Sequence, residues 1–310
     1  MDYARMVEEI SDCLSLRFGP QVATWCSGVP ALADEMADRW DLRLGDGYSY
    51  GASSVVLRCR RLTGGDGGAG GAGEDRAVLK LSPDQPFLAD QAAMLALFEP
   101  SGKVPAVLAV DADAGAVLLE SIEPGTGADE LPQPPSAQAW GDLIRALHDS
   151  VRPPPGFPRD LRGRCDEFFA RIGRRLAQPS IAAQVRPADL SAGADRYERL
   201  IATTPSPVLL HGDLHLGNVL DGGAVRGLVA IDPRACVGDP CFDAMDYALD
   251  GAGRDGVASR CAALASAAHL DPGRLHEWCR AVAPIIAIGR AGQTGQEAAV
   301  AELLTLARAS

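Results

Sequence analysis

Two carboxylates and one amide stand out in residues 207–232, which read PVLLHGDLHLGNVLDGGAVRGLVAID. Asp213 follows an apolar run, Asn218 comes five residues later, and Asp232 ends a second apolar run. Acids at the ends of short buried strands need partners, because an unpaired buried charge is costly. Asp and Asn oxygens suit Mg²⁺, which is usually shared with substrate phosphates. We therefore predict that Asn218 and Asp232 bind Mg²⁺ and that Asp213 accepts a proton from a nucleophile.

The order of these residues matches the D-x-x-x-x-N…D arrangement of kinase-type phosphoryl transfer. HGDLHLGN agrees with the catalytic-loop pattern H-R-D-L-x-x-x-N at four positions, and Gly212 stands where that pattern has Arg. Asp232 takes the place of the D-F-G aspartate, without the Phe-Gly. Turn-forming acids and a turn Asn are the alternative explanation. We predict that His148, His211 and His215 pack or form hydrogen bonds rather than act as catalysts.

HGDLHLGN, followed by IDP and GDPCFD, resembles the signature of the aminoglycoside phosphotransferases and related small-molecule kinases. The resemblance extends from about residue 25 to the C-terminus. Within that family the chain looks most like the streptomycin 6-kinase and hydroxyurea phosphotransferase branch, on VPALADEMADRWDLRLG, LVAIDPRACVGDP and WCRAVAPIIAIGRA. The resemblance implies an α+β, two-lobed protein-kinase-like fold. Its small N-lobe would hold an antiparallel sheet with one main helix, its larger C-lobe would be helical, and ATP would bind between them.

The resemblance also implies a nucleotide-binding lysine. Lys80 ends the apolar run RAVLKL, at the place of the family's phosphate-binding lysine, and the chain contains only one other lysine, Lys103. Family members usually carry a Glu on the N-lobe helix to pair with that lysine. Here Gln91 stands at that place. Either Gln91 or the neighbouring Asp90 is then the expected partner of Lys80.

Further nucleotide contacts are implied at two turns of the N-lobe. The turn GDGYSYGASS (45–54), which includes Ser53, would cover the phosphates. The stretch from Glu120 to Ile122 would be the hinge whose backbone pairs with adenine. The Gly-rich residues 64–73 contain a formal G-x-G-x-x-G. A strand rather than a helix is expected after them, so they predict a hairpin tip and not a dinucleotide site.

The elements that must position these residues follow from the hydropathy pattern. Residues 1–40 and 86–98 are predicted to be helical. Alternating or β-branched runs predict strands at 53–62, 76–82, 104–111 and 115–122, which indicates one antiparallel sheet. Helices are predicted at 137–150, 163–177, 186–203, 239–251, 256–268, 273–289 and 295–308, with short strands at 207–211, 218–221 and 227–232.

The texture of the sequence changes after Ile122, where the polar stretch EPGTGADELPQPPS predicts a hinge followed by a loop. We expect an N-lobe over residues 1–121, with a helical N-terminal segment, a five-stranded sheet and a helix that bind the nucleotide. We expect a helical C-lobe over residues 122–310, with the catalytic loop and the metal and acceptor sites.

Four acids follow the metal motif at spacings of four, three and four residues: Asp239, Asp243, Asp246 and Asp250. On one helix they would share a face. That face is predicted to be solvated, with Asp239 capping the helix, or to attract a polycationic substrate. Asp239 and Asp243 are also candidates to brace the catalytic loop.

Composition excludes several classes of protein. The chain has 310 residues, 47% of them apolar and 23% charged, as in ordinary globular proteins. The net charge of −12 and the absence of a basic run argue against nucleic acid. No run approaches the ~18 apolar residues of a membrane helix, and the acidic start does not resemble a secretion signal. We expect a cytoplasmic protein whose eight cysteines are buried, reduced thiols. The oligomeric state cannot be derived from the sequence.

The sequence thus predicts an ATP- and Mg²⁺-dependent kinase that phosphorylates a small hydroxylated cation. Lys80 would hold the α- and β-phosphates, Asn218 and Asp232 the Mg²⁺, and Asp213 would orient the acceptor hydroxyl. The resemblance favours streptomycin, at its 6-hydroxyl, as acceptor. Hydroxyurea, an endogenous sugar or amino alcohol, and a non-catalytic nucleotide-binding scaffold remain the alternatives. The four intact residues oppose the scaffold, whereas Gln91 supports it.

Overall fold

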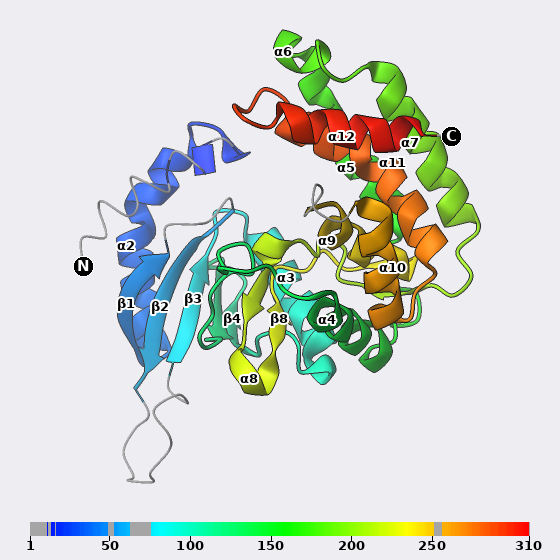
Figure 1. The fold of residues 1–310 in the computed structure, drawn as a ribbon. Coiled ribbons are helices and arrows are strands. Elements are labelled where there is room, and N and C mark those ends of the chain that lie inside the picture. The colour runs from blue at the N-terminus through cyan, green and yellow to red at the C-terminus, as the bar shows by residue number, and fades with distance from the viewer. Residues whose placement is uncertain are drawn as a thin grey trace. The chain divides into compact units, whose positions relative to one another are not determined.

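The computed structural model describes residues 11, 14–15, 17–48, 53–62, 76–250 and 256–309. The chain forms two compact units, and Figure 1 shows their elements. Unit 1 comprises the described residues up to Glu99 together with Val104–Gly125, and unit 2 comprises Pro100–Lys103 and the described residues from Thr126 onward. The Gly-rich residues 64–73 lie outside the described part of the chain.

Unit 1 is built on a five-stranded antiparallel sheet with the strand order β1-β2-β3-β5-β4. The strands are β1 (Leu42–Tyr48), β2 (Val55–Arg61), β3 (Arg76–Leu81), β4 (Val107–Asp111) and β5 (Ala116–Glu120). Four of them fall within the predicted runs. The hydropathy pattern does not reveal β1, whose pairing with β2 shifts register between Leu44 and Gly47.

Two helices accompany this sheet. Helix α2 (Val22–Arg39) lies along one face (Figure 1), and its residues Val29, Ala33 and Met36 share a buried cluster with strand residues such as Leu79. Helix α3 (Gln85–Phe98) begins at Asp84, whose side chain accepts a hydrogen bond from the backbone of Phe87. Because side chains alternate along a strand, Lys80 points to the face opposite Leu79.

Unit 2 is mainly helical, as the pattern predicts. Its helices are α4 (Ala137–Ser150), α5 (Leu161–Gly173), η2 (Arg174–Ala177), α6 (Pro179–Ala182), α7 (Pro187–Ala202), α8 (Gly223–Arg226), η4 (Pro240–Ala244), α9 (Met245–Asp250), α10 (Val257–Ala268), α11 (Pro272–Arg290) and α12 (Glu297–Arg308). Helix α11 is central and packs against α7, α10 and α12 (Figure 1). Trp140 of α4 and Trp278 of α11 are fully buried.

Two predicted helices are interrupted. The helix predicted at 163–177 ends as α-helix at Gly173 and continues as the 3-10 helix η2. The helix predicted at 239–251 is instead the 3-10 helix η4 followed by the six-residue α9. The change of helix type means that the four acids at 239–250 do not lie on one continuous α-helical face.

Two small antiparallel sheets complete unit 2. Strand β6 (Val208–Leu210) pairs with β9 (Cys236–Gly238), and β7 (Val219–Asp221) pairs with β8 (Leu228–Ala230). Strand β9 was not predicted. The 3-10 turn η3 (Leu216–Asn218) leads directly into β7.

The segment Pro100–Lys103 belongs to unit 2 although unit 1 precedes and follows it in the sequence. The backbone N–H of Ala230 donates to the carbonyl of Lys103 (2.7 Å), which adds this segment to the edge of β8. The Lys103 ammonium donates to the carbonyl of Arg226, and the Arg226 guanidinium donates to the carbonyl of Gly102 (3.3 Å). These hydrogen bonds fix the segment Pro100–Lys103 against unit 2.

Seven cysteines lie in the described ranges, and all are buried, unbridged thiols: Cys26, Cys59, Cys165, Cys236, Cys241, Cys261 and Cys279. This agrees with the prediction for these seven, and Cys13 lies outside the described residues. Across the described residues, no helix has both the length and the apolar character needed to cross a membrane.

Candidate active site

The loop that carries Asp213 leaves strand β6 through a conformation that requires glycine. Gly212 has a φ of +78°, and a Cβ atom there would lie 2.3 Å from the carbonyl oxygen of Arg234. Both the backbone conformation and the close approach exclude a side chain. This explains why Gly212 occupies the place of the arginine in the H-R-D pattern.

A buried carboxylate holds the start of this loop. Asp243 of η4, 1% exposed, accepts hydrogen bonds from the backbone N–H groups of His211 (2.7 Å) and Gly212 (2.9 Å) and contacts Nε2 of His148 at 2.9 Å. Burial acts to raise the pKa of Asp243, but hydrogen bonds from His148 and Gly212 and the nearby His211 hold it below its ordinary value. The predicted bracing role of Asp243 is confirmed.

His211 connects the loop to the strand that precedes Asp232. Its ring is fully buried, and Nε2 lies 3.0 Å from the carbonyl oxygen of Ile231. Burial lowers the pKa of His211, which favours the neutral ring, and a carbonyl can only accept, so Nε2 donates. His211 is therefore a structural hydrogen-bonding residue, as predicted.

The Asp213 carboxylate is held by an arginine from helix α5. Arg164 donates from Nη2 to Oδ1 of Asp213 (2.7 Å) and from Nε to the carbonyl of Gly212 (2.9 Å). The side-chain amide of Asn218 donates to the backbone carbonyl of Asp213 (2.9 Å). Sequence reasoning missed Arg164, which comes from a helix 49 positions away. The chain is rich in arginine, so its residue type gives no local signal.

Asn218 and Asp232 lie at the same end of the β7–β8 pair. Val219 is opposite Ala230 in the register, and the backbone N–H of Ile231 donates to the carbonyl of Asn218 (2.9 Å). Asp232 follows Ile231 and has a φ of +56°, in the left-handed region that non-glycine residues rarely adopt. The structure thus brings Asn218 and Asp232 together. The hydrogen bond from the Asn218 side chain to the backbone of Asp213 adds Asp213 to the same loop cluster.

The donor set at this strand end fits Mg²⁺. Asn218 uses its side-chain nitrogen toward Asp213, which leaves its amide oxygen as a possible metal ligand. In the part of the chain that the structure describes, no group of three or more His, Cys, Asp or Glu side chains could hold a metal ion. Mg²⁺ does not need one, because it binds one or two protein carboxylates and takes its other ligands from phosphates and water.

In unit 1, the Lys80 side chain lies against Gln91. Its Nζ donates to Oε1 of Gln91 at 3.0 Å, and Lys80 and Gln91 are 5% and 4% exposed. The sequence left Gln91 and Asp90 open as partners, and the structure shows this contact with Gln91. The predicted phosphate turn lies partly outside the described residues, which omit 49–52. Its described end, Ser53, accepts a hydrogen bond from Oγ of Ser82 (2.7 Å) at its backbone carbonyl.

The predicted hinge lies at the end of β5. The backbone N–H of Glu120 donates to the carbonyl of Ala106 (2.9 Å), and its carboxylate accepts from the N–H of Ala106 (3.0 Å). Ile122 is 7% exposed. A cavity of about 450 Å³ adjoins the hinge within unit 1, with residues of β1 and β2 and the stretch 121–125 in its lining. Tyr48 lies in that wall, with the Arg58 guanidinium 4.0 Å from its ring centre.

Comparison with known proteins places the chain in a family. Residues 40–292 match the family described as "Aminoglycoside/hydroxyurea antibiotic resistance kinase". The chain belongs to this family. It is 32% identical over 257 residues to the streptomycin 6-kinase of Streptomyces glaucescens, covering 82% of this chain and 77% of that one. It is 30% identical over 276 residues to the hydroxyurea phosphotransferase of Kitasatospora aureofaciens, covering 86% and 74%.

A solved relative shows the same fold. The aminoglycoside phosphotransferase APH(4)-Ia, in a ternary complex with ADP and hygromycin B, superposes with a TM-score of 0.57 at 14% identity, covering 89% of this chain and 99% of that one. The predicted α+β, protein-kinase-like fold is therefore confirmed. The predicted enzyme class is confirmed as well: this antibiotic resistance kinase is a phosphotransferase.

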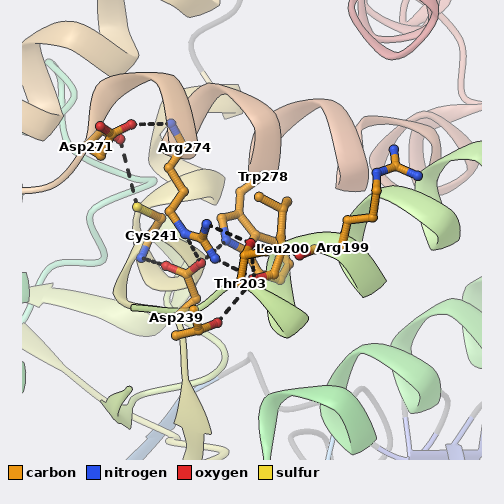
Figure 2. Close-up of polar contacts among 9 residues, drawn as sticks. Arg199, Leu200, Thr203, Asp239, Cys241, Asp271, Arg274 and Trp278 are labelled. Atoms are coloured by element: carbon orange, nitrogen blue, oxygen red, sulfur yellow. Dashed lines mark hydrogen bonds and ion pairs between the residues drawn. The ribbon is translucent and has the colours of Figure 1, made fainter. Parts of the chain in front are cut away.

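In this kinase, Asp239 does not belong to a solvated face. It is fully buried and accepts hydrogen bonds from Nε of Arg274 (2.5 Å) and Nε1 of Trp278 (2.7 Å), as Figure 2 shows. Its second oxygen caps η4 through the N–H of Cys241 (3.1 Å). Arg274 also donates to the carbonyl of Leu200 in α7. The prediction of a solvated face was wrong for Asp239 and Asp243, because both carboxylates fix packing between elements.

The pKa of the next acid, Asp246, depends on charges of the loop that carries Asp213. Desolvation raises the pKa of Asp246 to about 6, His215 and Arg164 act to lower it, and the charge of Asp213 raises it further. Asp250 at the end of α9 is exposed and contacts Arg290 at 3.5 Å. Only these last two acids of the predicted face reach solvent.

Proposed function

We propose that this kinase transfers the γ-phosphoryl group of ATP to a hydroxyl group of a small cationic acceptor, with streptomycin at its 6-hydroxyl as the first candidate. The observation that carries the proposal is the loop cluster of Asp213, Asn218 and Asp232. Asn218 and Asp232 lie at one end of the β7–β8 pair, and the Asn218 side chain bonds the backbone of Asp213, which supports the roles of a proton acceptor and two oxygen ligands. The similarity to a streptomycin 6-kinase over most of the chain supports the choice of acceptor.

Each residue has one role in this proposal. Asp213 orients the acceptor hydroxyl and takes its proton late in a loose transition state. Asn218 and Asp232 would hold Mg²⁺, which would offset the negative charge of the phosphates. Lys80 contacts the α- and β-phosphates, with Ser53 in the turn over them. The backbone from Glu120 to Ile122 pairs with the adenine.

Charge supports a cationic acceptor. The chain carries a net charge of −12, and Asp246 and Asp250 follow the catalytic segment with partial or full exposure. Such charge raises the local concentration of cations. Hydroxyurea is the second candidate, because the relative from Kitasatospora aureofaciens is named for it. No nucleic acid or membrane partner enters the proposal, and we expect the reaction in the cytoplasm.

The test measures ADP release with Mg²⁺-ATP and a panel of acceptors: streptomycin, dihydrostreptomycin, a deoxystreptamine aminoglycoside, hydroxyurea and simple hexosamines. We expect the fastest turnover with streptomycin and dihydrostreptomycin. Fast turnover with another acceptor alone would keep the kinase mechanism and exclude streptomycin. Nucleotide binding without transfer to any acceptor would support the scaffold instead.

The metal assignment needs a separate measurement. In Asp232→Ala and Asn218→Ala, we expect the Mg²⁺ concentration required for tight ATP binding to rise about tenfold or more, because each variant removes one proposed oxygen ligand. Fluorescence titration of the nucleotide at several Mg²⁺ concentrations reports this without turnover. Asp149→Asn, which changes an exposed acid at the end of α4, is the matched control. Unchanged Mg²⁺ dependence in both variants would contradict the assignment.

A further inference from the structure

We infer that Arg164 is a positioning residue for the proposed base: it fixes the orientation of the Asp213 carboxylate and offsets its charge. This inference rests on the proposed function. Arg164 is 8% exposed, and its guanidinium contacts the loop at two points, Oδ1 of Asp213 and the carbonyl of Gly212. A planar guanidinium that bonds both a side chain and the adjacent backbone fixes their relative orientation.

The helix that carries Arg164 is attached to the same small sheet as the loop. Asp160 caps α5 by accepting from the N–H of Gly163 (2.9 Å), and Asp160 forms a parallel bridge with Val237 of β9. The N–H of Val237 donates to the carbonyl of Arg159 (3.0 Å). Strand β9 pairs with β6, which leads into Asp213. The arginine and the carboxylate are therefore held by one continuous hydrogen-bonded framework.

One nitrogen of the Arg164 guanidinium forms no hydrogen bond with the described residues. Nη1 of Arg164 is buried and has no hydrogen-bond partner among the residues that the structure describes. A buried donor without a partner is destabilising, and a catalytic role is one of the reasons for which such a group is kept. The contacts of Arg164 with the loop therefore explain why an arginine is present despite this destabilisation.

The contact leaves one carboxylate oxygen for chemistry. Arg164 bonds Oδ1, and the structure shows no hydrogen bond from a described residue to Oδ2, which we therefore infer to face the acceptor hydroxyl. The positive charge also reduces the repulsion between this carboxylate and the anionic phosphoryl group that must approach it. The side chain of Asp213 is 33% exposed, so its outer part stays accessible. The proton still passes to Asp213, and Arg164 itself takes no part in the transfer.

The test compares Arg164→Ala and Arg164→Lys with Arg162→Ala. Arg162, on the same helix, is exposed and pairs with Glu198, so its loss removes a surface ion pair only. Turnover is measured with Mg²⁺-ATP and streptomycin and, in parallel, as ATP hydrolysis with water as acceptor. The second assay does not depend on which acceptor the enzyme prefers.

In Arg164→Ala we expect kcat to fall about 10²-fold, because a small misplacement of a catalytic group has effects of that size. The KM for ATP and the KM for streptomycin should each stay within about threefold of the wild-type value. Added guanidinium ion at tens of millimolar should raise the kcat of Arg164→Ala about tenfold. Arg164→Lys should lie between wild type and Arg164→Ala, and Arg162→Ala should match wild type.

Three results would overturn the inference: an unchanged kcat in Arg164→Ala, a loss confined to KM, or a loss that neither guanidinium ion nor lysine relieves. Thermal unfolding of each variant identifies a folding defect, and if Arg164→Ala is unfolded, the kcat of a folded Arg164→Lys decides. Asp213→Ala separates the two proposals. If it keeps wild-type turnover, the proposed base is wrong. If it is inactive while Arg164→Ala is fully active, only the positioning role fails.

Discussion

The proposed site residues of the two units have different surroundings. In unit 1, Lys80 sits between buried leucines in the third strand of a five-stranded sheet and contacts a neutral partner, Gln91. In unit 2, Asp213 sits on a loop held by the buried carboxylate of Asp243 and the buried guanidinium of Arg164. The lysine thus belongs to a packed strand of a wide sheet, whereas buried charged side chains hold the loop of the proposed base.

Strand length explains the difference. The strands of unit 1 have five to seven residues and form one five-stranded sheet, which is large enough to be stable on a packed face. The strands next to the catalytic loop have three residues each and pair in twos, which is marginal without further support. Polar side chains supply that support. We therefore expect changes in unit 1 to alter nucleotide affinity and changes in unit 2 to alter the chemical step or the fold.

The largest effect is expected at the proposed base. Asp213→Asn should lower kcat about 10³-fold, within the range for loss of a general base, while the KM for ATP changes by less than about threefold. Steady-state kinetics with the best acceptor of the panel measures both. A variant with a near-normal kcat and a raised KM for ATP would break the division of roles between the units.

The next effect concerns stability. Asp243→Asn should lower the free energy of unfolding by about 3 kcal/mol, because it disturbs a buried carboxylate that accepts bonds from His148 and two backbone N–H groups. Urea unfolding at neutral pH measures this loss, with Asp149→Asn as the exposed control. A loss equal to that of the control would show that buried charge does not hold the loop.

A smaller effect tests whether buried charge also holds unit 2 far from the loop. Asp189 at the start of α7, 5% exposed, accepts from Nη2 of Arg308 (2.6 Å) in α12 and from Nη2 of Arg186 (2.7 Å). Hydrogen bonds from Arg308 and then Arg186 hold the pKa of Asp189 far below its ordinary value. Asp189→Asn should lower the free energy of unfolding by about 2 kcal/mol at pH 7 without changing kcat.

The pH dependence of that difference has a fixed sign. A carboxylate with a depressed pKa in the folded state stabilises the protein above its unfolded pKa of about 3.9 and loses this stabilisation as the pH falls. The difference between wild type and Asp189→Asn should therefore begin to shrink when urea unfolding is repeated below about pH 4, and it should keep shrinking toward the lower pKa of the folded state. A difference that stays constant down to pH 3 would assign the loss to packing rather than to charge.

The smallest effect is expected in unit 1. Gln91→Leu removes one neutral hydrogen-bond acceptor from Lys80, which corresponds to about 1 kcal/mol and to an approximately fivefold higher KM for ATP, with kcat little changed. Gln85→Leu, at the exposed start of the same helix, is the control. A fall in kcat as large as that of Asp213→Asn would mean that Gln91 serves the chemical step, contrary to the comparison.

The sequence predicted what is local and missed what is distant. Asp213, Asn218 and Asp232 stand out because short apolar runs and turn residues place them in one frame, and the paired strands follow from the same pattern. Arg164 lies 49 positions from the carboxylate that it contacts, and it is one of many arginines. Buried charge pairs of this kind depend on tertiary packing, so no periodicity reveals them.

The four acids at 239–250 also show that the sequence does not reveal contacts with distant elements. Their spacing fits a solvated helical face, yet the chain forms a 3-10 turn there and buries two of them. Asp239 is fixed by Arg274 and Trp278 from α11, more than 30 positions later. Spacing alone cannot separate a solvated acid from a buried one when the partner comes from a distant element.

The excursion of Pro100–Lys103 into unit 2 has a consequence for exchanging parts between relatives. Because those residues add to the edge of β8 through Ala230, the chain passes between the units three times, and a single junction near Gly125 does not separate them. A chimera that takes its first half from another kinase would replace Pro100–Lys103, the segment that pairs with β8 just before Asp232. Recombination inside this enzyme must therefore transfer that short segment together with unit 2.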